Sequence, residues 1–453
     1  MSKPQSRLAS TEAPPPSLKT FAMLWSGQLV SSIGSEMTTF ALTLWAWDRT
    51  GQATPLALIL FFTQTPKVCA AVFAGVLVDT YDRQRLMLVS DLMVGIMTVI
   101  LLLLFLSQRL EIWQLYVTSI VNGLSGYLQN LAYSTTIPSI VPKVHYARAT
   151  AMDALKQASA YVFSPAIAGV LYPLIGFVGI LSIDLATLAI AMISLGLAVI
   201  PRRKATSSVR SWQPRQLTFG FQYIFQRSGL LAILLFLLAA NLFTSASFAL
   251  WPAFILARSG NDAMALASVR SAFGCGGLLG AAVLSIFGSP QPRIHGLLLG
   301  VALPQIGLIV LALGRNLSIW IGAAFIAAFF VPMLGSANQA IWLAKVESTV
   351  QGKVFAARFV IAQLSSPLGY AIAGPLADRL FEPALESGSW LASVLSPWLG
   401  TGAGTGIALQ LILLGICNLT VGFGGYGVPV LRNVEAMPDC ESPLESSFNS
   451  ERN

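Results

Sequence analysis

The amino-acid sequence predicts an all-α integral membrane protein with twelve transmembrane helices. Hydrophobic residues make up 55% of the 453-residue chain and charged residues only 10%, whereas a soluble globular domain has about 25% charged residues. Apolar stretches of about 20 residues, each long enough to cross about 30 Å of hydrocarbon, recur along the whole chain. They lack the two-residue alternation of a membrane β-barrel. A helix is then the structure that satisfies backbone amides within lipid.

The expected helices follow from these apolar stretches in chain order. The first six fall at about 21–45, 55–78, 86–106, 112–136, 150–173 and 178–200. The second six fall at about 229–256, 264–288, 294–313, 316–344, 354–376 and 403–428.

A basic segment, 201–228, interrupts the apolar pattern midway along the chain. We expect it to be a cytoplasmic linker between an N-terminal six-helix bundle, 21–200, and a C-terminal six-helix bundle, 229–428. The terminal segments 1–20 and 429–453 are expected to be cytoplasmic tails, the first disordered and the second acidic.

The two expected bundles also share a sparse sequence repeat. Shifting the sequence by about 202 residues aligns one bundle with the other, and an internal repeat of this kind indicates a duplicated structural unit. The positions that match under this one shift include Gly75 with Gly277, Lys143-Val144 with Lys345-Val346, Lys156 with Arg358, Ser164-Pro165 with Ser366-Pro367, and Pro173 with Pro375.

The net charge of +8 is explained by topology rather than by nucleic-acid binding. If the N-terminus lies in the cytoplasm, alternating loops place most Lys and Arg inside, as the positive-inside rule requires. The basic residues that fall outside are Arg49, Arg109, Arg258, Arg315 and Arg379. We therefore expect a multi-pass protein of the bacterial cytoplasmic membrane with both termini inside, surrounded by lipid, monomeric and without a nucleic-acid partner.

The stretch GVLVDTYDRQR (75–85) crowds charged residues directly after an apolar run. Gly75, Asp79, Arg83 and Arg85 match the loop 2–3 motif of the major facilitator superfamily, roughly G-x-L-a-D-r-x-G-r-k. That superfamily has two six-helix halves in parallel repeat. The match departs from the usual Arg, Gly and Arg or Lys at Thr80, Asp82 and Gln84.

Longer stretches resemble one branch of this superfamily, the macrolide-efflux and enterobactin-exporter-like transporters. The stretches are 24–42, 74–92, 164–179 and 352–378, so the resemblance spans both halves. It departs from proton-driven drug exporters at Asn122, where those proteins usually carry an Arg.

The resemblance implies a conformational latch made of Gly75, Asp79, Arg83, Arg85 and Arg358. Asp79, at the end of a helix, can accept hydrogen bonds from the positive N-terminus of the neighbouring helix 354–376. Gly75 permits close helix approach. The latch would join the two halves on the cytoplasmic side in the outward-open state. The alternative is a positive-inside loop without a role in gating.

The resemblance also implies that the first, fourth, seventh and tenth helices line a central cavity. Each carries polar side chains at three- and four-residue spacing, which places them on one helix face. Interhelical hydrogen bonding is the alternative role for any one of them. The substrate-cavity candidates are Gln28, Ser32, Asn122, Gln129, Asn241, Asn338, Gln339 and Trp342.

Glu36 lies past the middle of the first helix, where a carboxylate costs about 3 kcal/mol or more unless it is paired, hydrated or protonated. An acidic residue near this place is typical of the branch, so Glu36 is our candidate for proton coupling. The alternative is a fixed ion pair with Lys67 or Arg270, which could also contact substrate or bridge the halves. Asp91 and Asp184 are further buried charges, expected to reach toward the membrane surfaces.

These features predict proton-coupled efflux of an amphipathic small molecule, such as a macrolide-like drug, a siderophore or a secreted metabolite, by alternating access. An importer or a lysophospholipid-type lipid transporter is the alternative. A membrane-embedded enzyme is more remote, because the sequence lacks a convergent set of catalytic side chains. The sequence lacks a G-x-x-x-x-G-K-[ST] loop for ATP, and we expect neither a metal nor a cofactor.

Overall fold

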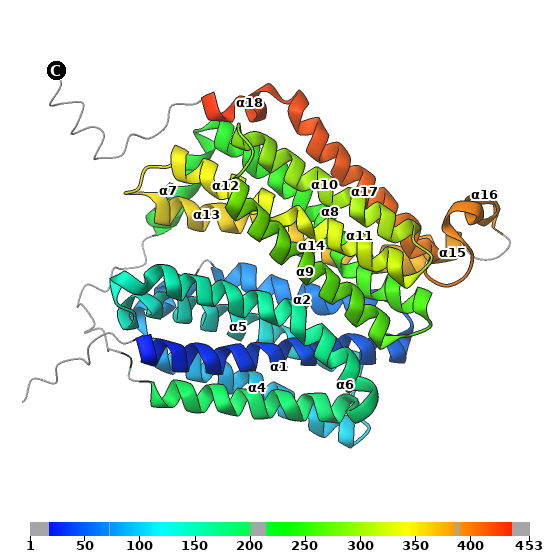
Figure 1. Ribbon diagram of the computed structural model, residues 1–453, viewed down its shortest axis with the longest axis horizontal. Coiled ribbons are helices and arrows are strands. Elements are labelled where there is room, and N and C mark those ends of the chain that lie inside the picture. The colour runs from blue at the N-terminus through cyan, green and yellow to red at the C-terminus, as the bar shows by residue number, and fades with distance from the viewer. Residues whose placement is uncertain (1–17, 72, 199, 201–213, 386–388, 437–453) are drawn as a thin grey trace, which may run out of the picture.

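The computed structural model describes residues 18–71, 73–198, 200, 214–385 and 389–436, with the backbone alone at 76, 79 and 214–217. All regular elements in these ranges are helices (Figure 1). The expected tails fall largely outside the described residues, as does the first part of the expected linker.

The first half of the chain forms six α-helices and one short 3₁₀ turn. They are α1 (Leu18–Thr50), α2 (Ala53–Ala71), α3 (Ala74–Thr80), α4 (Arg83–Leu106), α5 (Ile112–Ile140), η1 (Lys143–His145) and α6 (Tyr146–Leu197). The expected helix 55–78 is divided into α2 and α3. The expected helices 150–173 and 178–200 form the two arms of α6, which turns at Gly176 with a left-handed φ of 66°.

The second half begins inside the expected linker with α7 (Pro214–Phe225). The long helices that follow are α8 (Ser228–Ser259), α9 (Ala263–Phe287), α10 (Arg293–Leu313), α11 (Leu317–Phe329), α12 (Val331–Lys345), α13 (Gln351–Gln363) and α14 (Ser365–Leu376). After them come the π-helical turn η2 (Ala377–Phe381), α15 (Glu382–Ala384), α16 (Trp390–Leu399), α17 (Thr405–Gly424), η3 (Gly425–Gly427), α18 (Pro429–Arg432) and η4 (Val434–Ala436). The short helix α16 is not among the elements that the sequence predicts.

Within the described ranges, eight helical stretches are long and apolar enough to cross a membrane. One of them, Lys143–Leu197, covers two of the expected segments. The helices α1, α2 and α5 account for three more, and they carry polar side chains that lower their hydropathy. Side chains at half or more of the positions in most spans are not buried within the protein, as expected of helices that face lipid.

The buried apolar side chains form three clusters that reveal how the halves meet. One, the shared core, includes Phe40 and Trp47 of α1 together with Phe254 of α8 and Ala373 of α14, so it joins both halves. The other two each lie within one half: the N core around Phe21, and the C core around Trp342. Both lie at the end of the bundle where α1 begins and α18 lies.

We call that end the terminus end. In Figure 1 the two halves lie close together at the other end, where α6 contacts α9 and α2 contacts α14, and diverge toward the terminus end, where α7 and α18 are seen. The molecule is therefore joined at the opposite end and divided into separate cores at the terminus end.

Candidate transport site

The two halves are joined at the opposite end by hydrogen bonds to the first turn of α2. Asp378, in the turn η2, accepts hydrogen bonds from the backbone N–H groups of Ala53 at 2.9 Å and Thr54 at 2.7 Å. The Thr54 hydroxyl donates to the same carboxylate. The first N–H groups of a helix lack partners within it and carry partial positive charge, so a carboxylate is well matched to them. Nearby, the Trp47 indole donates to Asn261 Oδ1 at 2.7 Å.

Small residues let helices of the two halves approach closely at the same end. A Cβ atom added at Gly374 of α14 would lie 2.5 Å from the Thr54 Cα atom, and one added at Gly169 of α6 would lie 2.3 Å from the Ala267 Cβ atom. Neither helix pair could hold its present spacing with a larger side chain there. The joined end therefore depends on glycine as well as on Asp378.

Glu36 takes part in an electrostatic cluster that spans both halves. Its carboxylate interacts with Lys67 of α2 in its own half and with Arg270 of α9 in the other. Tyr161 of α6 interacts with both Glu36 and Arg270, and also with Tyr370 of α14. The structure thus brings together Glu36 and both basic residues named from the sequence.

These charges attract one another without a contact ion pair. Lys156 and Asp153, three positions apart on α6, do form a contact ion pair, with an N–O distance of 2.8 Å. The Arg270 guanidinium carbon lies 5.9 Å from the centre of the Phe40 ring. Tyr161 is 62% exposed although it lies mid-helix and next to Glu36 and Arg270. Glu36 and Arg270 are themselves only partly buried, so a proton or a polar ligand group can reach the carboxylate.

Two cavity candidates, Gln28 and Gln129, surround a buried carboxylate within the N-terminal half. Gln129 Nε2 lies 2.7 Å from Asp91 Oδ1 and 2.6 Å from Gln28 Oε1, and Gln28 Nε2 lies 3.5 Å from Asp91 Oδ2. Asp91 is 5% exposed. The three side chains come from α1, α4 and α5, so in this structure the two amides connect helices. Ser32, a turn away, donates to the Gln28 carbonyl at 2.6 Å.

Asp184 also lies in the interior rather than reaching toward a membrane surface. It is 2% exposed and accepts hydrogen bonds from the hydroxyls of Ser35 at 3.1 Å and Thr98 at 3.3 Å. The reason is the turn at Gly176, which starts the second arm of α6 eight positions earlier, about 12 Å along the helix. Asp184 therefore links α6 to α1 and α4.

Asn122 of α5 and Asn338 of α12 each have a buried side-chain oxygen without a hydrogen-bond partner among the described residues. A buried acceptor that lacks a partner costs about 1–3 kcal/mol, which a bound polar group can offset. Asn241 of α8 differs, because its amide nitrogen donates to the Ala362 carbonyl at 2.8 Å. The two asparagines are thus the cavity candidates whose polar atoms can still receive a donor.

The remaining candidates lie near the terminus end of the C-terminal half. Arg358 donates to Gln339 Oε1 at 3.0 Å, and its guanidinium carbon lies 5.0 Å from the Trp342 ring centre. Trp342 is fully buried in the C core. In this structure Trp342 therefore serves packing, and Arg358 is bound within its own half.

The N-terminal residues of the proposed latch are likewise placed within their own half. Arg83 donates to the Thr135 carbonyl of α5, Arg85 is exposed, and a Cβ added at Gly75 would meet nothing within 4 Å. The Asp79 side chain lies outside the described residues. The latch therefore stays a prediction for a state in which the terminus end is joined.

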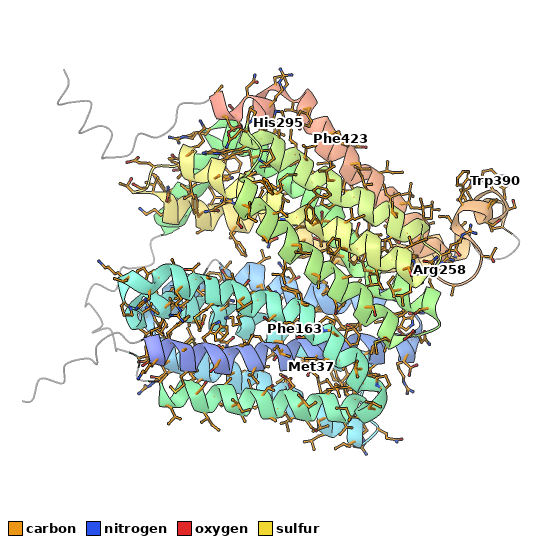
Figure 2. The ribbon with its side chains drawn as sticks, viewed as in Figure 1. Met37, Phe163, Arg258, His295, Trp390 and Phe423 are labelled. Carbon is orange, nitrogen blue, oxygen red and sulfur yellow. The ribbon has the colours of Figure 1, made fainter. Side chains whose placement is uncertain are left out.

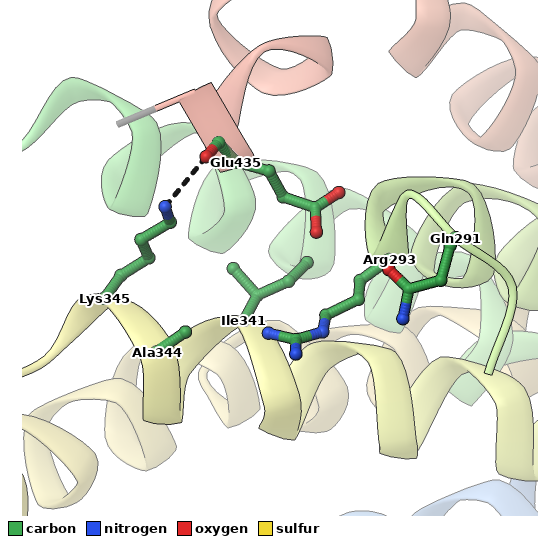
Figure 3. Close-up of a pocket in the computed structure, with 6 residues that line it drawn as sticks. All are labelled: Gln291, Arg293, Ile341, Ala344, Lys345 and Glu435. Carbon is green, nitrogen blue, oxygen red and sulfur yellow. Dashed lines mark hydrogen bonds between the residues drawn. The ribbon is translucent and has the colours of Figure 1, made fainter. Parts of the chain in front are cut away.

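A cavity of about 210 Å³ lies elsewhere, at the terminus end of the C-terminal half (Figure 3). Lys345 Nζ donates to the Glu435 carbonyl at 2.8 Å, and the Glu435 carboxylate accepts from the Ile294 N–H at 3.1 Å. This cavity lies within one half and includes none of the predicted site residues. Its lining residues are Gln291, Arg293, Ile341, Ala344, Lys345 and Glu435.

Comparison with known families supplies the assignment that this geometry suggests. A family model described as transmembrane secretion effector matches residues 9–378. The chain belongs to this family of major facilitator transporters. Members of this family are transporters, so the chain is a transporter and not an enzyme, as the sequence predicts.

Two relatives of this transporter from different bacteria are described as efflux proteins. Macrolide efflux protein A of Streptococcus pyogenes is 25% identical over 365 residues, which are 80% of this chain and 90% of that protein. The multidrug efflux pump Tap of Mycolicibacterium fortuitum is 22% identical over 383 residues, 82% of this chain and 91% of that protein. The predicted resemblance to the macrolide-efflux branch is confirmed.

A solved structure confirms the predicted major facilitator fold. The bacterial homologue of the human lysosomal transporter Spinster, in an inward-facing and unoccupied conformation, superposes with a TM-score of 0.71 at 13% identity. The match covers 95% of this chain and all of that one. The transporter is thus a multi-pass membrane protein with two six-helix halves.

The residues that join the opposite end are not among those predicted from the sequence. Asp378 follows the apolar stretch of α14 directly, in the sequence GPLAD (374–378), and it reads there as the first polar residue of a loop. A carboxylate placed just beyond a membrane helix is the signal that could have indicated it. Its partner, the start of α2, could not be inferred from the same stretch.

Proposed function

We propose that this transporter exports an amphipathic small molecule by alternating access, coupled to proton entry. The molecule would be a macrolide-like drug, a siderophore or another secreted metabolite. The observation that carries the proposal is the cluster of Glu36 with Lys67 and Arg270, because it connects a carboxylate inside the membrane to cations in both halves. A charge change at Glu36 can therefore alter how the halves hold together.

Alternating access requires one end to close while the other opens. The bonds from Asp378 to Ala53 and Thr54 support a closed opposite end. The separate N core and C core support an open terminus end. If the positive-inside bias places the terminus end in the cytoplasm, this is the state in which an exporter takes up its substrate.

Coupling follows from the attraction between Glu36 and Arg270. In the empty transporter this attraction helps to hold the halves together near the closed end. A proton on Glu36, or a substrate group placed between Glu36 and Arg270, removes the attraction and lets the halves move. The two ligands therefore compete for one carboxylate, and the transporter carries substrate outward and a proton inward in turn. Glu36 and Arg270 lie where the protein excludes much of the water, so their charges interact more strongly than they would in solution.

The chemistry around the cluster supports an amphipathic substrate. Tyr161 offers an exposed aromatic ring beside the charges. Tyr127 of α5 stacks on Phe359 of α13 across the halves, with ring centres 6.2 Å apart. Asn122 and Asn338 offer acceptors without partners. Aromatic walls with a few polar groups suit a ligand that is largely apolar and carries several oxygen or nitrogen atoms.

Inside-out vesicles that contain the transporter provide the test. A gradient with acid inside should drive uptake of macrolides, siderophores or dye-like drugs, and Glu36→Gln should abolish this dependence on the gradient. Glu347→Gln, the same change at an exposed site, is the matched control and should transport normally.

Uptake that is equal with and without the gradient, in both wild type and Glu36→Gln, would refute proton coupling. Transport found only in right-side-out vesicles would identify an importer. Movement of lysophospholipids in place of the drug panel would identify a lipid transporter.

A further inference from the structure

The short helix α16 presents an aromatic face that is largely exposed in the described structure. Trp390 is 74% exposed, Val394 51% and Trp398 73%. Positions four apart lie on one side of a helix, so these three side chains share a face. The stretch 389–405 contains no charged residue. The face is therefore uniformly apolar apart from the indole N–H groups.

The other face of α16 holds the helix firmly on the protein. Leu391, Ala392 and Leu395 pack against the shared core, and Leu399 is 4% exposed. The exposed tryptophans thus belong to a helix that is anchored along its whole length on the inner side.

Two arginines also fix the end of α16. Arg258, at the end of α8, donates to the Leu399 carbonyl at 2.6 Å. Arg315 donates to the Trp398 carbonyl at 3.3 Å and to the Pro397 carbonyl. The last carbonyls of a helix lack partners within it and carry partial negative charge, so cationic donors stabilise this end. The direction in which the tryptophans point is therefore set by the fold.

The place of α16 in the bundle indicates what covers its outer face. It lies at the opposite end, where α10 ends at Leu313 and α17 begins at Thr405, and it contacts both helices. Figure 1 shows α16 at the edge of the C-terminal half, and Figure 2 shows Trp390 at its outer side, away from Arg258. On α10, Ile306, Val310 and Leu313 are exposed and share one apolar face of this membrane span.

We propose that α16 lies in the membrane interface at this end, with Trp390 and Trp398 at the boundary between lipid headgroups and acyl chains. A helix of ten residues is about 15 Å long, and the two indoles, eight positions apart, sit near its two ends. Indole rings favour the interface because they combine an apolar ring with a hydrogen-bond donor. An amphipathic helix lying in the interface plane buries its apolar face in this way.

The absence of charge on 389–405 specifies the kind of lipid contact. Interfacial helices that depend on anionic lipids carry Lys or Arg on their polar side. Here the nearby Arg258 and Arg315 are bound to backbone carbonyls. The contact of α16 with lipid therefore does not require anionic headgroups.

Tryptophan quenching in nanodiscs that hold one chain each tests this proposal. The double variant Trp390→Phe/Trp398→Phe keeps an apolar face, and the emission that it lacks relative to wild type belongs to the two indoles. We expect phosphatidylcholine brominated near the headgroup end of its acyl chain to quench this difference emission at least twofold more than lipid brominated near the chain end. Iodide in the buffer should quench it little, and adding phosphatidylglycerol should change nothing.

The matched control is Trp320→Phe, which removes a tryptophan at the same end that is 4% exposed. Its difference emission should be insensitive to shallow brominated lipid. Difference emission of the double variant that is quenched by iodide and not by brominated lipid would overturn the proposal in favour of a water-exposed face. Protection from both quenchers only when two chains share a disc would overturn it in favour of a contact between copies.

Discussion

Asp378 and Thr54 lie 324 positions apart in the sequence and in different halves of the transporter, yet the Asp378 carboxylate accepts the Thr54 N–H at 2.7 Å. The bond places a carboxylate of one half against the first turn of a helix in the other half, where the helix carries partial positive charge. It makes the closed end of the bundle sensitive to a single side chain.

Replacing this carboxylate should open the end that it joins. Asp378→Asn keeps the shape but removes the charge, and we expect a loss of about 1–3 kcal/mol from the joined state. Spin labels at Gln52 and Arg379, both exposed at this end, should report a longer distance in a larger fraction of molecules. Asp262→Asn is the matched control, because Asp262 caps α9 within one half. An unchanged distance distribution in Asp378→Asn would contradict this role.

The close approach at Gly374 should be intolerant of even one methyl group. Gly374→Ala places a Cβ atom 2.5 Å from Thr54 Cα, so α14 and α2 must separate or shift. We expect at least a tenfold loss of transport rate with normal membrane insertion. Gly322→Ala, on a helix face with nothing within 4 Å, should behave like wild type. Equal transport activity of the two variants would show that α14 and α2 can move apart without a loss of function.

Glu36 and Arg270 should be energetically coupled across the halves. Glu36→Gln and Arg270→Gln each remove the attraction, so the double variant should cost less than the sum of the two single variants. A coupling energy of about 0.5–3 kcal/mol is expected for charges in one network. The same spin labels measure the population of the state joined at the opposite end. This population gives the free-energy change of each single variant and of the double variant. Strict additivity would show that the two side chains act independently.

The network around Asp91 should matter for stability more than for transport. Asp91→Asn can still bond to Gln28 and Gln129, whereas Asp91→Leu leaves both amides without that partner. We expect Asp91→Leu to lose about 2–4 kcal/mol, since each buried unsatisfied polar group costs about 1–3 kcal/mol, and Asp91→Asn to stay near wild type. Thermal unfolding in detergent distinguishes them. A stable Asp91→Asn protein without gradient-driven transport would instead assign proton coupling to Asp91.

The latch predicted at the terminus end leads to a separate prediction for Asp79. Asp79→Asn should insert into the membrane at the wild-type level yet transport at least tenfold more slowly, because the state joined at the terminus end would lose its carboxylate. Vesicle transport and quantitative immunoblots of the same membranes measure both quantities. Full transport by Asp79→Asn would show that the motif at 75–85 is a positive-inside loop without a role in gating.

The fold could be predicted because bilayer thickness fixes the length of each apolar stretch, and hydropathy records it directly. Finer features depend on neighbours that no single stretch contains. The sequence shows that Gln28 and Gln129 share polar helix faces, but their partner Asp91 becomes evident only when α1, α4 and α5 are packed together. Trp342 borders such a polar stripe and is nevertheless buried in the C core.

Two elements escaped prediction for reasons of length and distance. The helix α16 has ten residues, too few to register as a membrane span, and its packing surface comes from other helices. Asp378 acts on a helix start far away in the sequence. Glu36, by contrast, could be identified from sequence because a carboxylate within a membrane helix is costly wherever its partners lie.

Small residues lie at two places where helices of the two halves meet in the shared core: Ala57 of α2 faces Gly374 of α14, and Ala267 of α9 faces Gly169 of α6. Such a surface has shallow relief, so two helices can part without withdrawing long side chains from deep holes. Little apolar surface is therefore uncovered when the helices separate, which keeps the activation barrier of this conformational change low. The residues at this contact between the halves would thereby set the turnover rate of the transporter.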